Sequence, residues 1–180
     1  MRRAALALLA VVGLAAALSG GQPARAQHAA IVLSGWERSE AATGTVYYRC
    51  AATANCGERS TVSYRRQPDG ALASLAAFRS QNEAVDRDTI EASGGQIATI
   101  AILETSEGEI AGAKVQTVIK VIDHASGRRE FMATVRLSDG MRSYSIVSTS
   151  GQERIARANL QLFLPIVMLA GEIGGPLPRR

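Results

Sequence analysis

The chain has 180 residues and a formal net charge of +4, with 20 Lys and Arg against 16 Asp and Glu. This length suits one hydrophobic core and is too short for two full-sized domains. Three of the basic residues lie in an N-terminal segment that we expect to be removed, which leaves 17 basic against 16 acidic side chains. A nearly neutral protein lacks the broad positive surface that phosphate backbones require, so we expect no nucleic-acid partner.

The first 26 residues have the composition of a secretory signal peptide. Arg2 and Arg3 form a charged start, and residues 4–18 form an apolar run. Ala24-Arg25-Ala26 then places small residues at the two positions that a signal peptidase reads. The alternative is an uncleaved anchor, but the apolar run is short for a membrane span, which needs about 20 residues.

We therefore expect cleavage after Ala26 and a periplasmic or secreted protein that does not span the membrane afterwards. The mature chain is predicted to form one α+β domain over residues 27–173. Residues 174–180 are rich in Gly, Pro and Arg and are predicted to be a flexible tail.

The first half of the mature chain predicts a strand, a hairpin and a helix. Ile31-Val32-Leu33, leading into Gly35-Trp36, predicts a short first strand. Two β-prone runs, residues 45–50 and 60–66, are separated by a short loop and predict a hairpin. Beyond a turn, the apolar spacing of residues 71–85 predicts a helix.

The second half predicts a four-stranded meander. Residues 97–104 are β-prone, and Ser106-Glu107-Gly108 predicts the turn that ends this strand. In the next strand, apolar residues such as Val115 and Ile119 alternate with polar ones such as Lys120, which predicts a sheet with one buried face and one solvent face. The same alternation recurs over residues 131–137, and Asp139-Gly140 predicts a tight turn into a last strand.

The C-terminal segment predicts a helix that packs on this sheet. Ser150 and Glu153 have the spacing of a capping box, and Gly171 suits the C-terminal end. Pro165 should kink or break the helix. The stripe expected to face the sheet consists of Ile155, Leu162, Ile166 and Leu169.

The predicted fold class is therefore α+β, an antiparallel sheet made of a meander plus an N-terminal hairpin and flanked by two helices. An opening strand at Gly35-Trp36, a helix after the hairpin, a long meander and a terminal helix with Phe163 in its middle resemble the PsbP-like fold family. That family takes its name from an extrinsic photosystem II subunit and includes exported bacterial proteins. The resemblance implies a non-catalytic binding or assembly module, with no catalytic residue to carry over.

Cys50 and Cys56 are the only cysteines in the chain. In an oxidising compartment, an even number of cysteines favours a disulfide, here closing the loop of the predicted hairpin. A redox role is disfavoured because the spacing is not C-x-x-C. A zinc site would require His28 and His124 as the remaining ligands. We expect no metal and no cofactor.

His124 is the one candidate for catalysis. Its neighbours Asp123 and Ser126 allow a hypothesis of a hydrolase with His124 as the base, whereas a polar hairpin loop explains the same residues through backbone preferences. Glu104, Glu107 and Glu109 are expected to surround an exposed turn. We therefore expect no enzyme activity.

Two surfaces are candidates for an interface. Tyr48, Arg49, Arg65 and Arg66 gather on the predicted hairpin, and Tyr and Arg are favoured at binding hot spots. The second surface is the back of the C-terminal helix, which is apolar on all sides and must be covered or bind a partner. Its residues are Leu160, Leu164 and Met168.

These observations favour an exported, non-enzymatic periplasmic protein that binds a protein or an envelope component. Two alternatives stay open. One is a small envelope hydrolase that uses His124, and the other is a carrier of a small apolar ligand held between the sheet and a helix.

Overall fold

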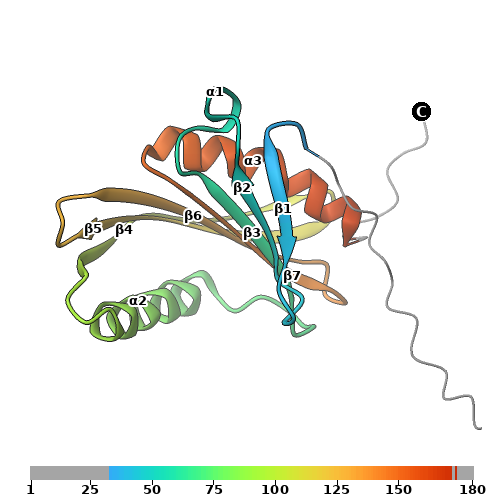
Figure 1. Cartoon of the computed structure of the whole chain (residues 1–180). Helices are drawn as coiled ribbons and strands as arrows, with labels where there is room; N and C mark the ends of the chain where they lie inside the picture. Colours follow the sequence, from blue (N-terminus) through green and yellow to red (C-terminus); the bar gives the residue numbers. More distant parts are fainter. Residues whose placement is uncertain (1–32, 172, 174–180) are drawn as a thin grey trace, which may run out of the picture.

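The computed structural model describes residues 33–171 and residue 173, so the predicted signal peptide and tail lie outside the described residues. Seven strands form one antiparallel sheet in the order β1-β2-β3-β7-β6-β5-β4. Helix α3 lies on one face of the sheet and helix α2 on the other, as Figure 1 shows. The predicted fold class is thus confirmed.

The elements follow the predicted order, with one additional short helix. Their bounds are β1 (Trp36–Glu40), β2 (Val46–Cys50), α1 (Thr53–Cys56), β3 (Thr61–Gln67), α2 (Leu75–Ala92), β4 (Ile97–Ile110), β5 (Ala113–His124), β6 (Arg129–Ser138), β7 (Ser143–Ser150) and α3 (Glu153–Ala170). No described helix has the length and apolar character to cross a lipid bilayer.

The predicted first strand is described only in part, because Ile31 and Val32 lie outside the described residues and its remaining residues lead into a turn. The chain turns at Ser34-Gly35, where the amide of Trp36 donates to the carbonyl of Leu33. Gly35 has φ +82°, a left-handed conformation that a regular strand does not contain. The first strand of the described residues, β1, therefore begins at Trp36, and it pairs with β2.

Strand β4 is longer than predicted. Ser106-Glu107-Gly108 resembles a turn in composition, yet Gly108 pairs with Val115 inside the β4–β5 ladder. The chain reverses instead at Ala111 and Gly112, both with positive φ (50° and 80°), which gives the twist that two-residue hairpin turns need. Glu104, Glu107 and Glu109 consequently lie along an edge strand rather than around a turn.

The main core lies between the sheet and α3. Phe163 of α3 is fully buried, with its ring centroid 4.8 Å from that of Tyr48 and 5.1 Å from that of Trp36. Val62, Ile146, Leu137 and Val167 are also fully buried in this layer. Aromatic pairs with edge-to-face geometry add about 1 kcal/mol each beyond the area that they bury.

Helix α3 presents a different face to the sheet than predicted. Leu162 and Leu169 are 47% and 64% exposed, whereas Leu160, Phe163 and Val167 are buried. Because the helix is apolar on nearly every side, its composition does not select a face, and packing around Phe163 does. The helix continues through Pro165, which lies on the exposed side, and Gly171 follows its last residue.

The capping box is also not formed. Helix α3 begins at Glu153 with Gln152 at the N-cap, and no side chain caps its amides. Glu153 instead accepts a hydrogen bond from Arg157 at 2.8 Å.

Candidate binding surface

The two faces of the sheet are covered to different extents. Helix α3 covers β3, β7 and β6 on one face, whereas α2 on the other face packs only on β4 and β5 (Figure 1). Beyond α2, the face formed by β6, β7, β3 and β2 is covered by no helix of the described residues.

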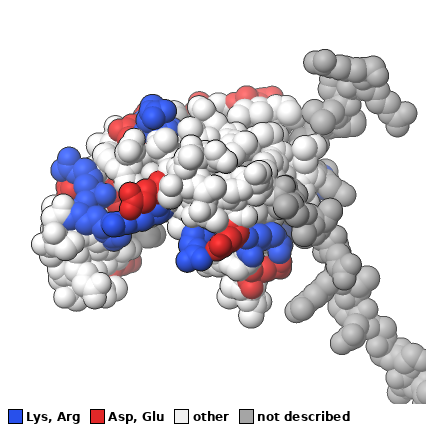
Figure 2. All heavy atoms as spheres, turned by 45° about the horizontal axis from the view of Figure 1, so that its top comes forward, with Lys and Arg blue, Asp and Glu red and all other residues white. Residues whose placement is uncertain are grey.

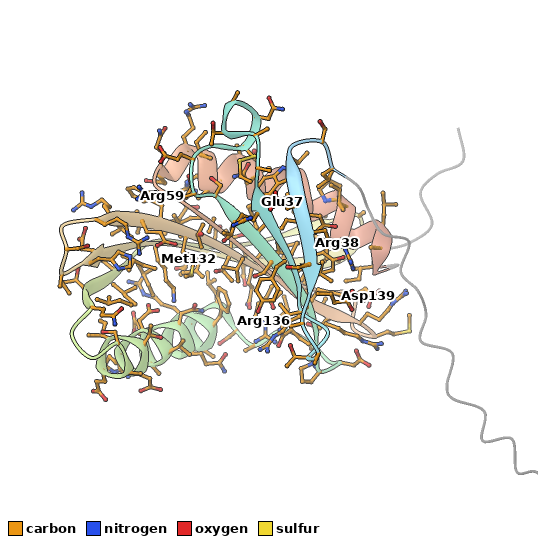
Figure 3. All side chains as sticks on the ribbon, viewed as in Figure 1. Glu37, Arg38, Arg59, Met132, Arg136 and Asp139 are labelled. Carbon is orange, nitrogen blue, oxygen red and sulfur yellow. A yellow bond between two sulfur atoms is a disulfide. The ribbon has the colours of Figure 1, made fainter. Side chains whose placement is uncertain are left out.

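The strand registers show which side chains lie on this uncovered area. Lys120 of β5 bonds to Asp86 of α2, so Lys120 points to the α2 side of the sheet. Residues directly opposite one another in a ladder share a face. We therefore define the open sheet face as Tyr47, Arg49, Thr61, Ser63, Arg65, Met132, Thr134, Arg136, Ser145, Val147 and Thr149. Figure 3 shows Met132 and Arg136 on the α2 side of the ribbon.

Hydroxyl groups dominate the open sheet face. Thr61 and Thr149 share a hydrogen bond of 2.9 Å across β3 and β7, and Ser145 accepts one from Gln67 at 2.7 Å. Tyr47 is 45% exposed and is the one aromatic ring on this face. The surface therefore offers donors and acceptors in fixed positions beside a single aromatic contact.

Arg65 and Arg136 lie on either side of Ser145. Ser145 of β7 is opposite Arg65 of β3 and opposite Arg136 of β6. Neither arginine forms an ion pair with any residue that the structure describes, and the buried Nε of Arg136 has no hydrogen-bond partner. An unpaired guanidinium that is partly removed from water is costly, and an arriving anion would offset that cost.

Arg49, at the β1 side of the face, is already paired. Its Nη2 lies 2.6 Å from Oε2 of Glu37, and this hydrogen bond raises the pKa of the Arg49 guanidinium above its ordinary value. Glu37 is opposite Arg49 in the β1–β2 ladder. The positive charge available to a partner thus comes from Arg65 and Arg136.

Charges on the opposite side of the molecule are more evenly matched. On the side of α3, which Figure 2 brings forward, basic and acidic side chains lie beside one another in small mixed groups. Arg157 of α3, for example, pairs with both Glu153 and Glu104 at 2.7 and 2.9 Å.

Only part of the predicted hairpin surface is exposed on the open sheet face. Arg49 and Arg65 are exposed on the open sheet face, but Tyr48 is 1% exposed and belongs to the core, because it points to the α3 side. Arg66 points away from the open sheet face and pairs with Asp69 at 2.9 Å. Tyr48 and Arg66 are therefore removed from this candidate surface.

The predicted surface on the back of the C-terminal helix is wrong. Leu160 and Met168 are 5% and 7% exposed and pack in the core, and Leu164 is half-buried against it. These three residues face the sheet because α3 is rotated relative to the predicted stripe.

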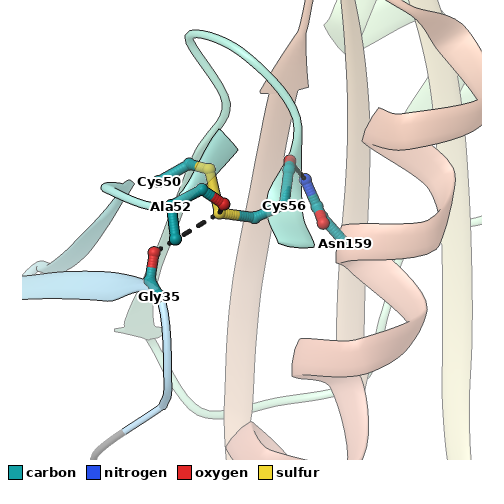
Figure 4. Close-up of a disulfide and its surroundings, with 5 residues drawn as sticks. All are labelled: Gly35, Cys50, Ala52, Cys56 and Asn159. Atoms are coloured by element: carbon teal, nitrogen blue, oxygen red, sulfur yellow. Dashed lines mark hydrogen bonds between the residues drawn. A yellow bond between two sulfur atoms is a disulfide. The ribbon is translucent and has the colours of Figure 1, made fainter. Parts of the chain in front are cut away.

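The disulfide between Cys50 and Cys56 is present, as predicted, with the two Cα atoms 5.7 Å apart. It joins the end of β2 to the end of α1 (Figure 4). Asn159 of α3 donates to the carbonyl of Cys56 at 3.0 Å, and the Cys56 sulfur is 3.4 Å from the carbonyl oxygens of Gly35 and Ala52. The bridge therefore closes the β2–β3 loop, the hydrogen bond from Asn159 ties this loop to α3, and Cys56 is shielded from solvent at 2% exposure.

His124 and Asp123 do not form the base–carboxylate pair that the hydrolase hypothesis assumes. Asp123 and His124 are consecutive in a strand, so their side chains point to opposite faces of the sheet. Asp123 accepts hydrogen bonds from Arg129 at 2.7 Å and Thr99 at 3.3 Å. His124 contacts Arg128 at 2.8 Å and Glu130 at 3.4 Å. Such contacts among charged and polar side chains are typical of the end of a hairpin.

Two hollows lie away from the open sheet face. One of about 450 Å³ lies between α1 and the start of α3, beside Asn55 and Ile155. The other, of about 260 Å³, lies between α2 and β4, beside Arg87 and Ile100. Among the described residues, no three His, Cys, Asp or Glu side chains gather as metal ligands would.

Composition and register together define an α+β protein whose antiparallel sheet carries a core on one face and an uncovered polar area on the other. No family model and no curated protein matches the chain. The solution structure of cyanobacterial PsbP (CyanoP) from Synechocystis sp. PCC 6803 matches it with a TM-score of 0.51 and 11% identity, over 77% of this chain and 82% of that chain. This chain therefore has a PsbP-like fold, as the resemblance in sequence pattern implied.

A crystal structure of a protein of unknown function from Pseudomonas aeruginosa also aligns, with a TM-score of 0.40 and 14% identity, over 82% of this chain and 90% of that chain. At these identities the likeness concerns the fold alone.

Proposed function

We propose that this protein is an exported, non-enzymatic domain that binds a protein or an envelope component through the open sheet face. The observation that carries the proposal is the pair of unpaired arginines, Arg65 and Arg136, on the half of the sheet that α2 leaves uncovered. A monomeric domain gains nothing in stability from such groups, whereas Arg beside Tyr is a favoured composition of binding hot spots.

Export is supported by the composition of residues 1–26 and by the disulfide, which persists in an oxidising compartment. Intact-mass measurement on protein from fractionated cells tests it. We expect periplasmic protein that begins at Gln27 and contains no free thiol. An unprocessed chain with two free thiols would contradict this part of the proposal.

The binding function is tested by retention of a partner from an envelope extract of the same organism. We expect the wild-type protein to retain a partner and the variant Arg65→Glu/Arg136→Glu to lose it. Arg154→Glu is the matched control, because Arg154 is exposed on α3 and forms no ion pair with a described residue. A protein that stays monomeric and retains nothing, or a partner that both variants retain equally, would contradict the proposal.

The absence of catalysis is tested separately through His124. Generic ester, peptide and glycan substrates are offered to the wild-type protein and to His124→Ala. We expect no activity in either, and an activity that disappears with the substitution would establish the hydrolase alternative.

The space between α3 and the sheet, where a small apolar ligand would lie, is filled by Phe163 and Val167, which are fully buried.

A further inference from the structure

We propose that the partner presents an extended acidic peptide segment, which lies across β3, β7 and β6 on the open sheet face with its carboxylates at Arg65 and Arg136. This inference rests on the proposed function and adds the chemistry of the partner.

The open sheet face has a net positive charge. It contains Arg49, Arg65 and Arg136, and the carboxylate that approaches it from β1, Glu37, is occupied by Arg49. Arg65 and Arg136 are therefore the two groups of this face that can bind an anion. A planar guanidinium binds a carboxylate through two parallel hydrogen bonds. This complementarity favours an acidic partner over a neutral or basic one.

The spacing of the arginines suits neighbouring carboxylates of one extended chain. Arg65, Ser145 and Arg136 form a line across three adjacent strands. Adjacent strands are about 4.8 Å apart, which places the two arginine Cα atoms roughly 10 Å apart. In an extended peptide, side chains two residues apart point the same way with a spacing of about 7 Å. Flexible arginine side chains readily span the difference.

The next line across the sheet suits a peptide backbone. It consists of Tyr47, Ser63, Val147 and Thr134, which are opposite one another in successive ladders. Hydroxyl groups both donate and accept, so Ser63 and Thr134 match the alternating amides and carbonyls of an extended chain. The exposed ring of Tyr47 adds apolar contact area at low entropic cost.

The recessed position of Arg136 favours a peptide over a flat membrane surface. Arg136 and Thr134 are half-buried, and the segment 68–74 crosses the same side of the sheet, where Gly70 and Ala73 accept hydrogen bonds from Ser138 and Gln116. In Figure 1, α2 and this segment stand out from the sheet on that side. A bilayer would contact these projections first, whereas a single extended chain needs only the width of the strands that no described helix covers on this side.

The test is a binding titration with fluorescein-labelled oligo-glutamate, followed by fluorescence anisotropy. Oligo-glutamine, a single-stranded oligonucleotide and vesicles containing anionic lipid are measured in parallel. We expect binding of oligo-glutamate that weakens as salt is added, and no binding of oligo-glutamine. Arg65→Ala and Arg136→Ala should each weaken binding about tenfold or more, because each removes a charge-assisted contact. Arg154→Ala should leave the affinity within a factor of about two, as expected for a charge remote from the site.

Several results would overturn the inference. These are no binding of oligo-glutamate, equal binding by the Arg65 and Arg154 variants, and preferential binding of the oligonucleotide or the vesicles. Arg136→Gln serves as a second variant, and circular dichroism confirms that each variant is folded. If the envelope partner is still lost on Arg65→Glu/Arg136→Glu while oligo-glutamate does not bind, the acidic segment is wrong and the proposed function stands. If no partner is retained at all, the proposed function itself fails.

Discussion

Lys120 of β5 and Asp86 of α2 form a buried ion pair, with Nζ 2.5 Å from Oδ1 and side-chain exposures of 4% and 11%. The pair fixes α2 over one half of the sheet and so determines where the open sheet face begins. It also helps to explain why β5 does not have the solvent face that its alternation predicts, since α2 covers Lys120 and the segment before α2 covers Gln116 through Ala73.

Removal of one member of this pair should destabilise the fold strongly. Lys120→Met or Asp86→Leu alone leaves an unpaired buried charge, so we expect a loss of about 3–5 kcal/mol in the free energy of unfolding. The double variant Lys120→Met/Asp86→Leu should recover most of this loss, because no charge remains buried. Urea denaturation measures all three.

The control for the ion pair is the exposed pair of Arg79 and Glu83 on the same helix, 3.0 Å apart. Arg79→Ala should cost less than about 1 kcal/mol, as exposed pairs do. A similar cost for Lys120→Met and Arg79→Ala would contradict the view that Lys120 and Asp86 hold α2 in place.

The disulfide should stabilise the fold modestly. Cys50→Ser/Cys56→Ser opens a loop with a sequence separation of 6, so the chain-entropy model predicts a loss of about 2 kcal/mol. Denaturation of the wild-type protein in the presence and absence of reductant gives the same comparison without a substitution. No change in the denaturation midpoint on reduction would show that the β2–β3 loop is held by other contacts.

The orientation of α3 can be tested with two leucines of that helix. Leu160 is 5% exposed and Leu169 is 64% exposed. Leu160→Ala should therefore lower the free energy of unfolding by about 2–5 kcal/mol, the range for buried leucines. Leu169→Ala should change it by less than about 0.5 kcal/mol, as exposed substitutions do. A larger loss of stability in Leu169→Ala than in Leu160→Ala would contradict this orientation and support the helix face predicted from the sequence.

Asp123 should show a pH-dependent interaction with Arg129. The hydrogen bond from Arg129 holds the pKa of the Asp123 carboxyl below its ordinary value of 3.8, and Thr99 contributes as well. Since the folded-state pKa is lower than the unfolded one, the stabilising contribution is present above pH 3.8 and is lost as the pH falls through the folded-state pKa.

An NMR titration of side-chain carboxyl carbons measures this shift. Arg129→Ala should raise the pKa of Asp123 toward 3.8. Arg128→Ala should leave it in place, because Arg128 pairs with Glu130 instead. An unchanged pKa in Arg129→Ala would show that the pair does not persist in solution.

The element order could be predicted because it depends on local signals. Alternation in β5 and β6 and the Asp139-Gly140 turn identify the meander, and the side chain of Asp139 does accept hydrogen bonds from the amides of Met141 and Arg142 in that turn. The face of α3 could not be predicted, since a helix apolar all round packs wherever Phe163 fits between Trp36 and Tyr48.

The candidate surface could be predicted only where it lies within one hairpin. The gathering of Arg and Tyr on one hairpin predicts Arg49 and Arg65, whereas Arg136 and Ser145 depend on the pairing of β6 with β7 and of β7 with β3. The same is true of Lys120 and Asp86, which are 34 residues apart in sequence. A period-2 pattern assigns a residue to a face, but only the register and the covering helix show which part of that face stays open.

The most direct test of the central claim is photo-crosslinking in the native envelope from a probe in place of Tyr47. A benzophenone amino acid at this exposed position of the open sheet face should give one discrete adduct with a partner. The same amino acid at Leu169, which is more exposed but lies on α3, should give none. Adducts from Leu169 alone, or equally from both positions, would contradict binding through the open sheet face.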